Sequence, residues 1–347
     1  MLETQNIKAQ SFASCLELWY NDNKRELPWR ESIDPYSVWL SEIILQQTQV
    51  KQGWDYYLKI IKAFPTVSDL ACVSVDDFYP YWAGLGYYSR ARNLLKTAQI
   101  VSEKHNNFFP NTKSELLKLP GIGDYTASAI ASICFDSKDV AMDGNLNRVF
   151  GRISEFGKDL KVQKHKSELK TIAESFAPKS NLGDFNQSLM DLGSSICTSS
   201  NPKCPICPVS VFCEARKADT QLSFPFKSKP IKKELLHLHY FIHDDDNIHI
   251  KKRTDGIWNN LFELPGFWLN NQNEVIYNNS NLNFDDLILT QPIWKTKHLL
   301  SHKIMHIHFH KLTTETNTTF EILNKNEIHT KAFPRPIEKF ICDFIGD

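Results

Sequence analysis

The sequence lacks several features that would place a protein in a special class. It contains no run of about eighteen apolar residues, the length that a membrane-spanning helix requires. Its start, MLETQNIKAQSF, has no basic segment followed by an apolar one, as a secretory signal would. Its 40 basic and 40 acidic residues cancel, so bulk charge gives no argument for a nucleic-acid partner. We therefore expect a cytoplasmic protein without a membrane contact.

Internal repeats and low-complexity tracts are also absent, and the 347 residues are about twice the length of a usual domain. Over residues 6–218 apolar residues recur at three- and four-residue spacing, which predicts helices. Later stretches such as HLHYFIH and KIMHIHFHKL alternate with period two, which predicts half-buried strands. The expected fold class is multidomain, with a mostly α domain over residues 1–220 and an α+β domain over residues 235–347.

The segment between the two expected domains differs in composition from both. Residues 221–234 read QLSFPFKSKPIKKE, with two prolines and four lysines. Such a composition is typical of an exposed linker. The second domain is expected to end in a helix over residues 335–345.

Four of the eight cysteines, Cys197, Cys204, Cys207 and Cys213, fall within the loop CTSSNPKCPICPVSVFC. Four thiolates this close would repel one another unless a metal centre absorbed their charge, and four cysteines suit zinc or an iron-sulfur cluster. One short pair flanked by single cysteines fits a compact [4Fe-4S] cluster better than the paired knuckles of a zinc ribbon. We predict a [4Fe-4S] cluster at this loop, with zinc or four unrelated thiols as alternatives.

The stretch LPGIGD connects predicted helices over residues 113–117 and 125–134. Gly121 and Gly123 permit backbone angles closed to other residues and let another backbone approach closely. The amides at the start of the second helix, together with its dipole, form a site for a phosphate oxygen. Taken alone, the motif is equally an ordinary helix connection with a glycine cap.

Two carboxylates are candidate catalytic groups. Glu42 lies on an apolar helical stripe in YSVWLSEIILQQTQV, so burial should raise its pKa and let it act as a general acid; the alternative is that Glu42 snorkels or pairs with Arg30. Asp143, in VAMDGNLNRVF, is first of all a helix N-cap, which fixes one carboxylate oxygen and leaves the other free. One protonated and one ionised carboxyl group are what cleavage of a glycosidic bond requires.

The motifs LSEIILQQT, WAGLGYYSRARNL, LPGIGDYTASAI, MDGNLNRV and GDFNQSLMDLGSSIC, with the cysteine loop, resemble the MutY adenine DNA glycosylases of the helix-hairpin-helix superfamily. The resemblance covers nearly all of residues 6–218, in the order and spacing of the family. It implies a two-lobed helical domain with a [4Fe-4S] cluster. It also implies that the enzyme acts on double-stranded DNA and removes adenine mispaired with 8-oxoguanine or guanine. We expect the chain to act as a monomer.

By this resemblance Glu42 protonates the adenine ring and Asp143 stabilises the sugar cation. Gln47, Leu85 and Tyr87 match residues that enter the duplex and fill the space left by the extruded base. Extrusion of the base costs on the order of a few kcal/mol, which such contacts must offset. The residues assigned to contacts with DNA or the lesion are Arg30, Gln47, Leu85, Tyr87, Gly121, Gly123, Ser301 and His302.

Tyr125 indicates a reaction without strand cleavage. In the sister endonuclease III group a lysine at the matching position attacks the sugar and forms a Schiff base. A phenol cannot form that imine. The resemblance therefore implies base excision by a monofunctional enzyme.

The second domain resembles the C-terminal domain of the same enzymes, a relative of the Nudix fold, through GIWNNLFELPGF, HLLSHKIMHIHFH and FPRPIEKF. No Arg-Glu-x-x-Glu-Glu cluster follows Gly256, so a pyrophosphohydrolase is excluded. Ser301 and His302 match the residues that read 8-oxoguanine, although Leu300 stands where the family has an aromatic residue. Alternation from His302 to His310 places four histidines on one strand face, which we expect to be solvated or to face DNA rather than to hold a metal.

Two other functions are compatible with parts of the sequence. One is an endonuclease III-like enzyme that acts on damaged pyrimidines, against which Tyr125 and the C-terminal domain speak. The other is a non-catalytic iron-sulfur protein that binds DNA. The presence of both Glu42 and Asp143 favours an enzyme over this second alternative.

Overall fold

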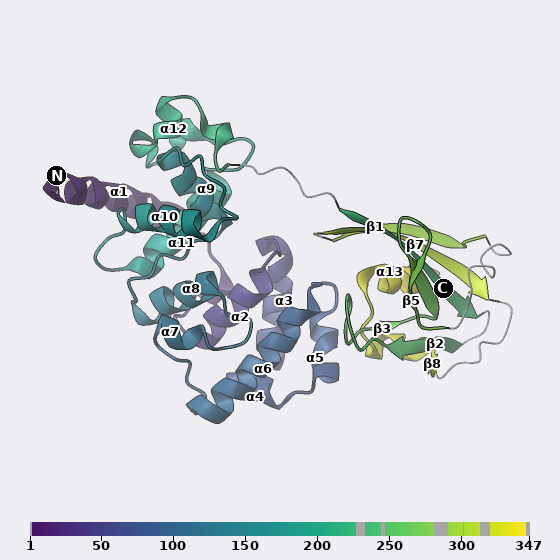
Figure 1. Ribbon diagram of the computed structural model, residues 1–347. Coiled ribbons are helices and arrows are strands. Elements are labelled where there is room, and N and C mark those ends of the chain that lie inside the picture. The colour runs from purple at the N-terminus through teal and green to yellow at the C-terminus, as the bar shows by residue number, and fades with distance from the viewer. Residues whose placement is uncertain are drawn as a thin grey trace. The chain divides into compact units, whose positions relative to one another are not determined.

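The protein is described by a computed structural model that covers residues 2–226, 233–243, 247–280, 291–300, 302–312 and 320–344 (Figure 1). The chain divides into two compact units, residues 1–73 with 92–229, and residues 74–91 with 230–347. The short segment 74–91 thus groups with the C-terminal part of the chain. The domain boundaries expected from the sequence stay a prediction. In the described part of the chain, no helix is long and apolar enough to cross a membrane.

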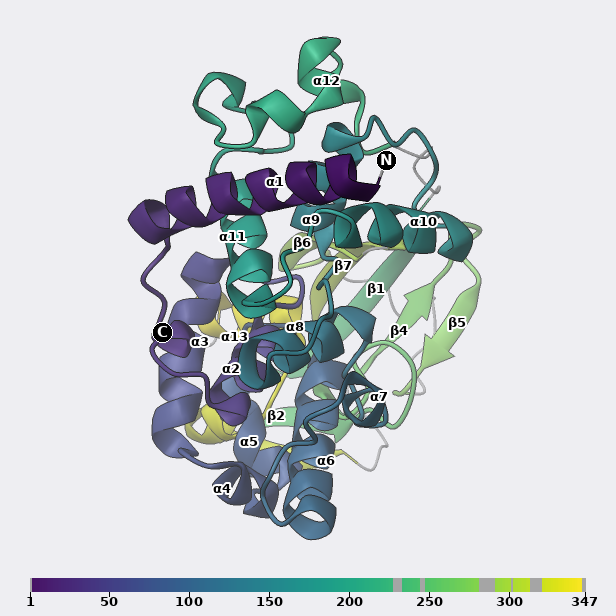
Figure 2. The ribbon, with the colours of Figure 1, turned by 90° about the vertical axis from the view of Figure 1, so that its left-hand side faces the viewer.

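The first unit is helical. Its elements are α1 (Leu2–Asn23), η1 (Pro28–Arg30), α2 (Pro35–Leu45), α3 (Val50–Ala63), α4 (Val67–Cys72), most of α6 (Tyr88–His105), α7 (Lys113–Leu116), α8 (Asp124–Phe135), α9 (Gly144–Ile153), α10 (Gln163–Glu174), α11 (Leu182–Ser195), η2 (Cys204–Ile206), η3 (Ser210–Phe212), α12 (Glu214–Lys217) and η4 (Gln221–Ser223). Helices α1, α9, α10 and α12 gather at one end of this unit and α4 and α6 at the other, with α2 and α8 between them (Figures 1 and 2).

Helices α2 and α8 form the interior of the first unit. Both are apolar on nearly every side, so residues 38–41 of α2 and 126–132 of α8 are buried. Helix α2 begins at a well-formed cap, because the Asp34 carboxylate accepts from the backbone N–H of Ser37 at 2.9 Å and Pro35 occupies the first helical position. Helix α8 packs against α2, α7 and α11. This interior position is what brings polar residues of α2 and α8 into a water-poor environment.

The beginning of the segment predicted to be an exposed linker is attached to α9. The Arg152 guanidinium donates hydrogen bonds to the carbonyl oxygens of Gln221 at 2.8 Å and Phe224 at 3.3 Å. A Cβ atom added at Gly151 would lie 3.6 Å from Pro225. Residues 221–225 therefore belong to the packing of the first unit, and residues 227–232 lie outside the described part.

The second unit contains two sheets. Its elements are α5 (Val75–Trp82), β1 (Glu234–His243), β2 (Asn247–Lys252), β3 (Phe262–Glu263), β4 (Gly266–Leu269), β5 (Val275–Asn278), β6 (Trp294–Leu299), β7 (Lys303–Leu312), β8 (Glu321–Asn324), η6 (Lys325–Thr330) and α13 (Arg335–Phe344). One sheet has the order β5-β4-β1-β7-β6, in which only β1 and β7 pair in parallel, and the other has the order β3-β2-β8. The expected α+β class of the C-terminal part is confirmed.

One face of the larger sheet builds the core of the second unit. Even-numbered residues of β1 and odd-numbered residues of β7 point into it, as the alternation predicted. Phe309 of β7 stacks on Phe340 of α13 with ring centroids 4.0 Å apart. The core also encloses an ion pair, in which Arg253 donates to Glu263 at 2.7 Å.

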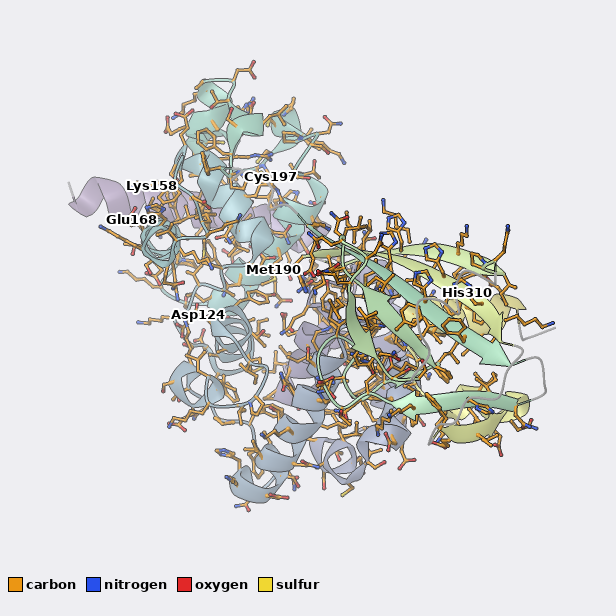
Figure 3. All side chains as sticks on the ribbon, turned by 45° about the vertical axis from the view of Figure 1, so that its right-hand side comes forward. Asp124, Lys158, Glu168, Met190, Cys197 and His310 are labelled. Carbon is orange, nitrogen blue, oxygen red and sulfur yellow. The ribbon has the colours of Figure 1, made fainter. Side chains whose placement is uncertain are left out.

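The opposite face of the larger sheet carries the histidines, and the expectation of a solvated face holds in part, because burial increases along β7 from His302, which is exposed, to His310. His306, His308 and His310 of β7 lie beside His237 and His239 of β1, because the two strands pair in register. His310, labelled in Figure 3, is only 2% exposed, and its Nε2 atom lies 3.1 Å from Nδ1 of His239. The imidazole rings therefore pack on one another across the two strands, while His306 and His308 stay partly exposed.

These packed imidazoles predict acid-sensitive stability. Burial, then the neighbouring histidines, lowers the pKa of His239 to about 3 and that of His308 to about 4. An unfolded histidine has a pKa of about 6.5, so the unfolded chain binds protons first and stability is lost as the pH falls below about 6.5. We expect the urea midpoint of the second unit to fall between pH 7 and pH 4.5, and to fall less steeply in His308→Phe. Parallel curves for the two proteins would show that the histidines do not cause the loss.

Candidate active site

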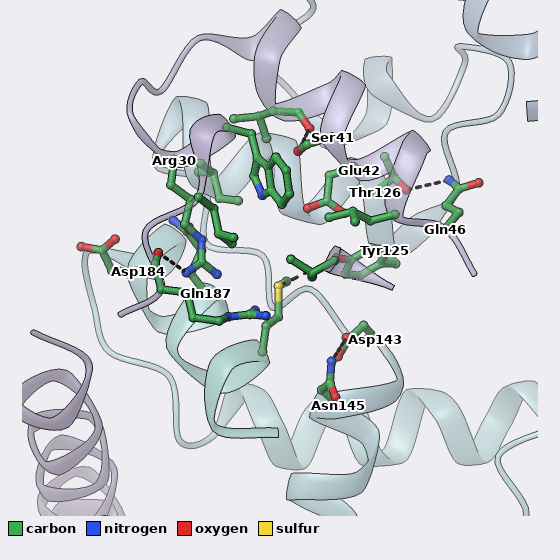
Figure 4. A pocket seen from close by; sticks show the side chains of 18 of the residues that line it. Arg30, Ser41, Glu42, Gln46, Tyr125, Thr126, Asp143, Asn145, Asp184 and Gln187 are labelled. Carbon is green, nitrogen blue, oxygen red and sulfur yellow. Dashed lines mark hydrogen bonds between the residues drawn. The ribbon is translucent and has the colours of Figure 1, made fainter. Parts of the chain in front are cut away.

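Glu42, Tyr125 and Asp143 line one pocket of about 1150 Å³ in the first unit (Figure 4). Glu42 comes from α2, Tyr125 from the first turn of α8, and Asp143 from the position that caps α9. More than a hundred residues of sequence separate the first from the last. The fold therefore places the two predicted carboxylates in the same cavity, although their roles stay predictions.

The Glu42 carboxyl group is set up to hold a proton. Burial raises its pKa to about 7; a hydrogen bond from Tyr125 acts in the opposite direction, and the nearby negative charge of Asp143 raises the pKa further. The structure excludes the alternative that Arg30 pairs with Glu42. Both outer nitrogens of the Arg30 guanidinium bind the Asp191 carboxylate instead, at 2.8 and 3.1 Å.

Tyr125 contacts Glu42 and Met190 in the pocket. Its phenol bonds to the Glu42 carboxyl group, and its oxygen lies 3.8 Å from Sδ of Met190 on α11. Burial and the two nearby carboxylates raise the pKa of Tyr125 well above 10, so the phenol stays protonated.

Asp143 has both of its oxygens bound, which corrects the expectation that one remains free. Its Oδ1 atom accepts from the backbone N–H of Leu146 at 2.7 Å, as an N-cap does, and Oδ2 accepts from the Asn145 side chain at 2.7 Å. The short side chain of Asn145, two residues on, can reach back to the cap. Burial raises the pKa of Asp143, and these hydrogen bonds oppose that rise by stabilising the carboxylate.

A chain of hydrogen bonds runs from Asp143 along α9 towards the cysteine loop. Asn145, bound to Asp143, accepts from the Arg148 guanidinium at 2.8 Å. The same guanidinium donates to the carbonyl oxygen of Cys197 at 2.7 Å and to that of Gly193 at 2.6 Å. The loop that holds the cysteines is thus attached to the helix whose N-terminus carries Asp143.

Only one of the two glycines in the turn LPGIGD has the backbone conformation that we predicted. Gly121 has a φ of +77°, and a Cβ atom there would lie 2.8 Å from Cβ of Asn93, so no other residue fits. Gly123 instead has an ordinary φ of −91° as the N-cap of α8, which corrects the expectation for this residue. A Cβ at Gly123 would meet nothing within 4 Å, so a ligand backbone has room there.

The predicted duplex-entering residues differ in exposure. Gln47 lines the pocket and adopts a φ of +57°, a left-handed conformation that costs a non-glycine residue free energy. Tyr87, in the second unit, also has a positive φ of +48° and is 47% exposed. Leu85 is 7% exposed, so it could enter a duplex only if the loop moved. Its loop is held by a hydrogen bond from the Trp82 indole to the carbonyl of Gly86 at 3.0 Å.

The two residues predicted to read the lesion are only partly described. His302 is exposed at the start of β7, and its carbonyl oxygen accepts from the backbone N–H of Glu234 at 3.1 Å. Ser301 lies outside the described residues.

Several pocket residues were not predicted individually. Gln187 and Met190 of α11 line the cavity, and Gln46 bonds to Thr126 at 3.4 Å beside Glu42. The buried Asp191 holds Arg25 as well as Arg30. The signal available in the sequence was the stretch GDFNQSLMDLGSSIC, whose polar residues recur every three or four positions and therefore share a helix face.

The four cysteines of the loop surround one small cavity next to α9 and the end of α11. In the described part of the chain, no three histidine, cysteine or acidic side chains converge on a point where a single metal ion could be held. Four cysteine thiols around one cavity are the donor set that an iron-sulfur cluster takes. The Arg152 guanidinium donates to the Sγ atom of Cys197 at 3.2 Å, as expected beside an anionic centre. The donor set therefore fits a [4Fe-4S] cluster.

Two family descriptions match the chain. Residues 40–178 match the HhH-GPD superfamily of base excision DNA repair proteins, and residues 237–342 match the NUDIX domain. Among solved structures, a thermostable thymine-DNA glycosylase is similar, with a TM-score of 0.56 and 28% identity over 61% of this chain and 98% of its own. Endonuclease III bound non-covalently to DNA shares the fold, with a TM-score of 0.52 and 21% identity over 61% of this chain and 98% of its own.

Relatives match over both units. The adenine DNA glycosylase of Buchnera aphidicola from Acyrthosiphon pisum is 35% identical over 96% of this chain and 97% of its own length. The human adenine DNA glycosylase is 40% identical over 60% of this chain and 40% of its own. The nearly full-length match, together with the fold and the pocket, shows that this chain belongs to the MutY family of adenine DNA glycosylases, which hydrolyse N-glycosyl bonds.

Proposed function

We propose that this enzyme excises adenine paired with 8-oxoguanine or guanine in double-stranded DNA, without cutting the strand. The observation that carries the proposal is the pairing of two carboxyl groups with unlike surroundings in one pocket. Glu42 sits where a neutral carboxyl is favoured, with a pKa of about 7, and Asp143 accepts two hydrogen bonds that favour its anion. Unlike environments for two carboxyl groups are what acid-assisted cleavage of a glycosidic bond needs.

Glu42 would deliver the proton. At neutral pH a group with this pKa is partly protonated, so it can give its proton to a ring nitrogen of the extruded base and turn adenine into a better leaving group. Tyr125, which donates to Glu42, holds the carboxyl group in a fixed orientation. The Arg30 guanidinium, fixed by Asp191, lines the same pocket and leaves Glu42 without a competing ion pair.

Asp143 would stabilise the positive charge that develops on the sugar as the bond breaks. Its two donors, Leu146 N–H and Asn145, fix the carboxylate before reaction, so no reorganisation is needed in the transition state. Water then adds to the sugar carbon that the base has left and loses a proton, which completes hydrolysis.

Base extrusion needs groups that occupy the vacated space. Gln47 and Tyr87 are held in left-handed conformations. Such a conformation costs on the order of 1–3 kcal/mol per residue, and residues strained in this way cluster at functional sites. We assign them, with Leu85, to entry into the duplex. The open space at Gly123 and the unpaired first-turn amides of α8 would receive a phosphate oxygen.

Recognition of 8-oxoguanine is assigned to Ser301 and His302, on the resemblance alone. Cys197, Cys204, Cys207 and Cys213 would hold the [4Fe-4S] cluster. When bound, that group supplies a one-electron centre or a rigid brace for the loop that α9 connects to Asp143.

Removal of either carboxyl group should stop base excision. In single-turnover reactions with a duplex that carries one adenine opposite 8-oxoguanine, Glu42→Gln should lose roughly 10²–10⁴-fold in rate because the proton donor is gone. Asp143→Asn should lose roughly 10²–10³-fold because the anion is gone. Matched controls are Glu103→Gln and Asp22→Asn, which make the same changes at exposed positions of α6 and α1. Rates within a few-fold of wild type would mean that both carboxylates are structural.

The rate of base excision should depend on pH, and Tyr125 should shift the pH at which the rate falls. Because the protonated form of Glu42 is required, the rate should fall as the pH rises above about 7. The bond from Tyr125 stabilises the Glu42 anion, so Tyr125→Phe should raise the pKa of Glu42 and move the alkaline limb to higher pH. A pH-rate profile of both proteins measures this. An alkaline limb at the same pH in the variant would count against a tyrosine bond to Glu42.

The absence of a lysine at position 125 should be visible in trapping experiments. Sodium borohydride captures the Schiff base of a lyase as a covalent protein–DNA complex. We expect no high-yield complex with the wild-type protein, and a detectable one with Tyr125→Lys. Efficient trapping of wild-type protein would show that another amine acts as a nucleophile.

A further inference from the structure

Arg152 is a buried cation on α9. Its side chain is 1% exposed, and its position one helical turn beyond Arg148 directs it at the cysteine loop. A charge so far from water must be compensated, because an uncompensated buried charge costs several kcal/mol or more.

The partners of Arg152 do not include an acid. Its guanidinium donates to the carbonyl oxygens of Thr198 at 2.8 Å, Ser199 at 3.2 Å, Gln221 at 2.8 Å and Phe224 at 3.3 Å, and to Cys197 Sγ at 3.2 Å. Among the described residues, no carboxylate lies within 4.0 Å of it. Carbonyl oxygens satisfy its N–H groups but carry no formal charge.

Another buried arginine shows how a carboxylate compensates the charge of a buried guanidinium. Arg253 in the second unit is 4% exposed and pairs with the fully buried carboxylate of Glu263. Arg30 pairs in the same way with Asp191. For Arg152 the group in the corresponding place is the sulfur of Cys197, at the edge of the cavity that the four cysteines surround.

We propose that Arg152 is the internal counter-charge of the cofactor bound at Cys197, Cys204, Cys207 and Cys213, and that it sets the reduction potential of that cofactor. The inference rests on the proposed [4Fe-4S] cluster. A cluster held by four thiolates carries net negative charge, so a buried cation beside one ligand stabilises it. Because reduction adds an electron, the cation stabilises the reduced state more than the oxidised one.

The planar, forked guanidinium group also explains why position 152 carries an arginine and not a lysine. Its planar nitrogens reach acceptors on both sides, from Thr198 and Ser199 to Gln221 and Phe224. It therefore ties the start of the cysteine loop to the segment that follows α12. A lysine would keep the charge but could not span these acceptors.

Three variants separate charge from shape. Arg152→Gln keeps an N–H donor and removes the charge, whereas Arg152→Lys keeps the charge and loses the fork. Arg216→Gln is the matched control, because Arg216 lines the same cavity but is exposed, so solvent screens its charge. For each full-length protein, iron and sulfide content, the visible absorption spectrum and the midpoint potential of the cluster are measured, with adenine excision followed alongside.

We expect a more negative midpoint potential in Arg152→Gln than in wild type, a potential near wild type in Arg152→Lys, and a smaller shift in Arg216→Gln. Loss of iron from Arg152→Gln but not from Arg152→Lys also supports the proposal. An unchanged potential in Arg152→Gln, or equal loss of iron from both variants, would overturn it. Wild-type protein without iron and sulfide would overturn the cofactor proposal as well, whereas the excision assay reports on the carboxylates independently.

Discussion

The partial burial of one carboxyl group underlies the chemistry that we propose for this protein. Glu42 lies on α2, a helix that is apolar on nearly every side and packs against α8 in the middle of the first unit. Burial raises the pKa of Glu42 to about 7, and the fold leaves it without an ion pair because Asp191 takes Arg30. The general acid that we propose is thus a product of packing, and its residue type alone would not make one.

Helix termini organise the rest of the first unit. The start of α8 places Tyr125 beside Glu42, and the start of α9 places Asp143 across the pocket. Because backbone amides at a helix start need acceptors, the same local geometry binds the Asp143 carboxylate and provides for a phosphate. Helix α9 then runs from the pocket to the cysteine loop, and Arg148 and Arg152 bind that loop one turn apart. The proposed catalytic and cofactor sites therefore share helix α9.

The second unit also encloses buried polar groups. Arg253 is enclosed by the rings of Trp268 and Tyr277, at 4.4 and 4.1 Å from its guanidinium carbon, and pairs with Glu263. His239 of β1 and His310 of β7 lie within hydrogen-bond distance of each other, and the pKa of His239 is lowered to about 3, which keeps its ring neutral. Both arrangements depend on strand register, since a shift of one residue would turn every side chain to the other face.

The sequence alone predicted the helical and α+β halves, the positive φ of Gly121 and two candidate carboxylates, Glu42 and Asp143, that line one pocket, because these depend on local periodicity and on residue types at fixed spacing. Only the tertiary structure decided that Arg30 binds Asp191, that Asn145 occupies the second oxygen of Asp143, and that the histidine face is packed. It also decided that residues 221–225 attach to α9 through Arg152. Each of these is a contact between segments far apart in the chain, or a choice among acceptors, and periodicity carries no information about which partner a charged or polar side chain will meet.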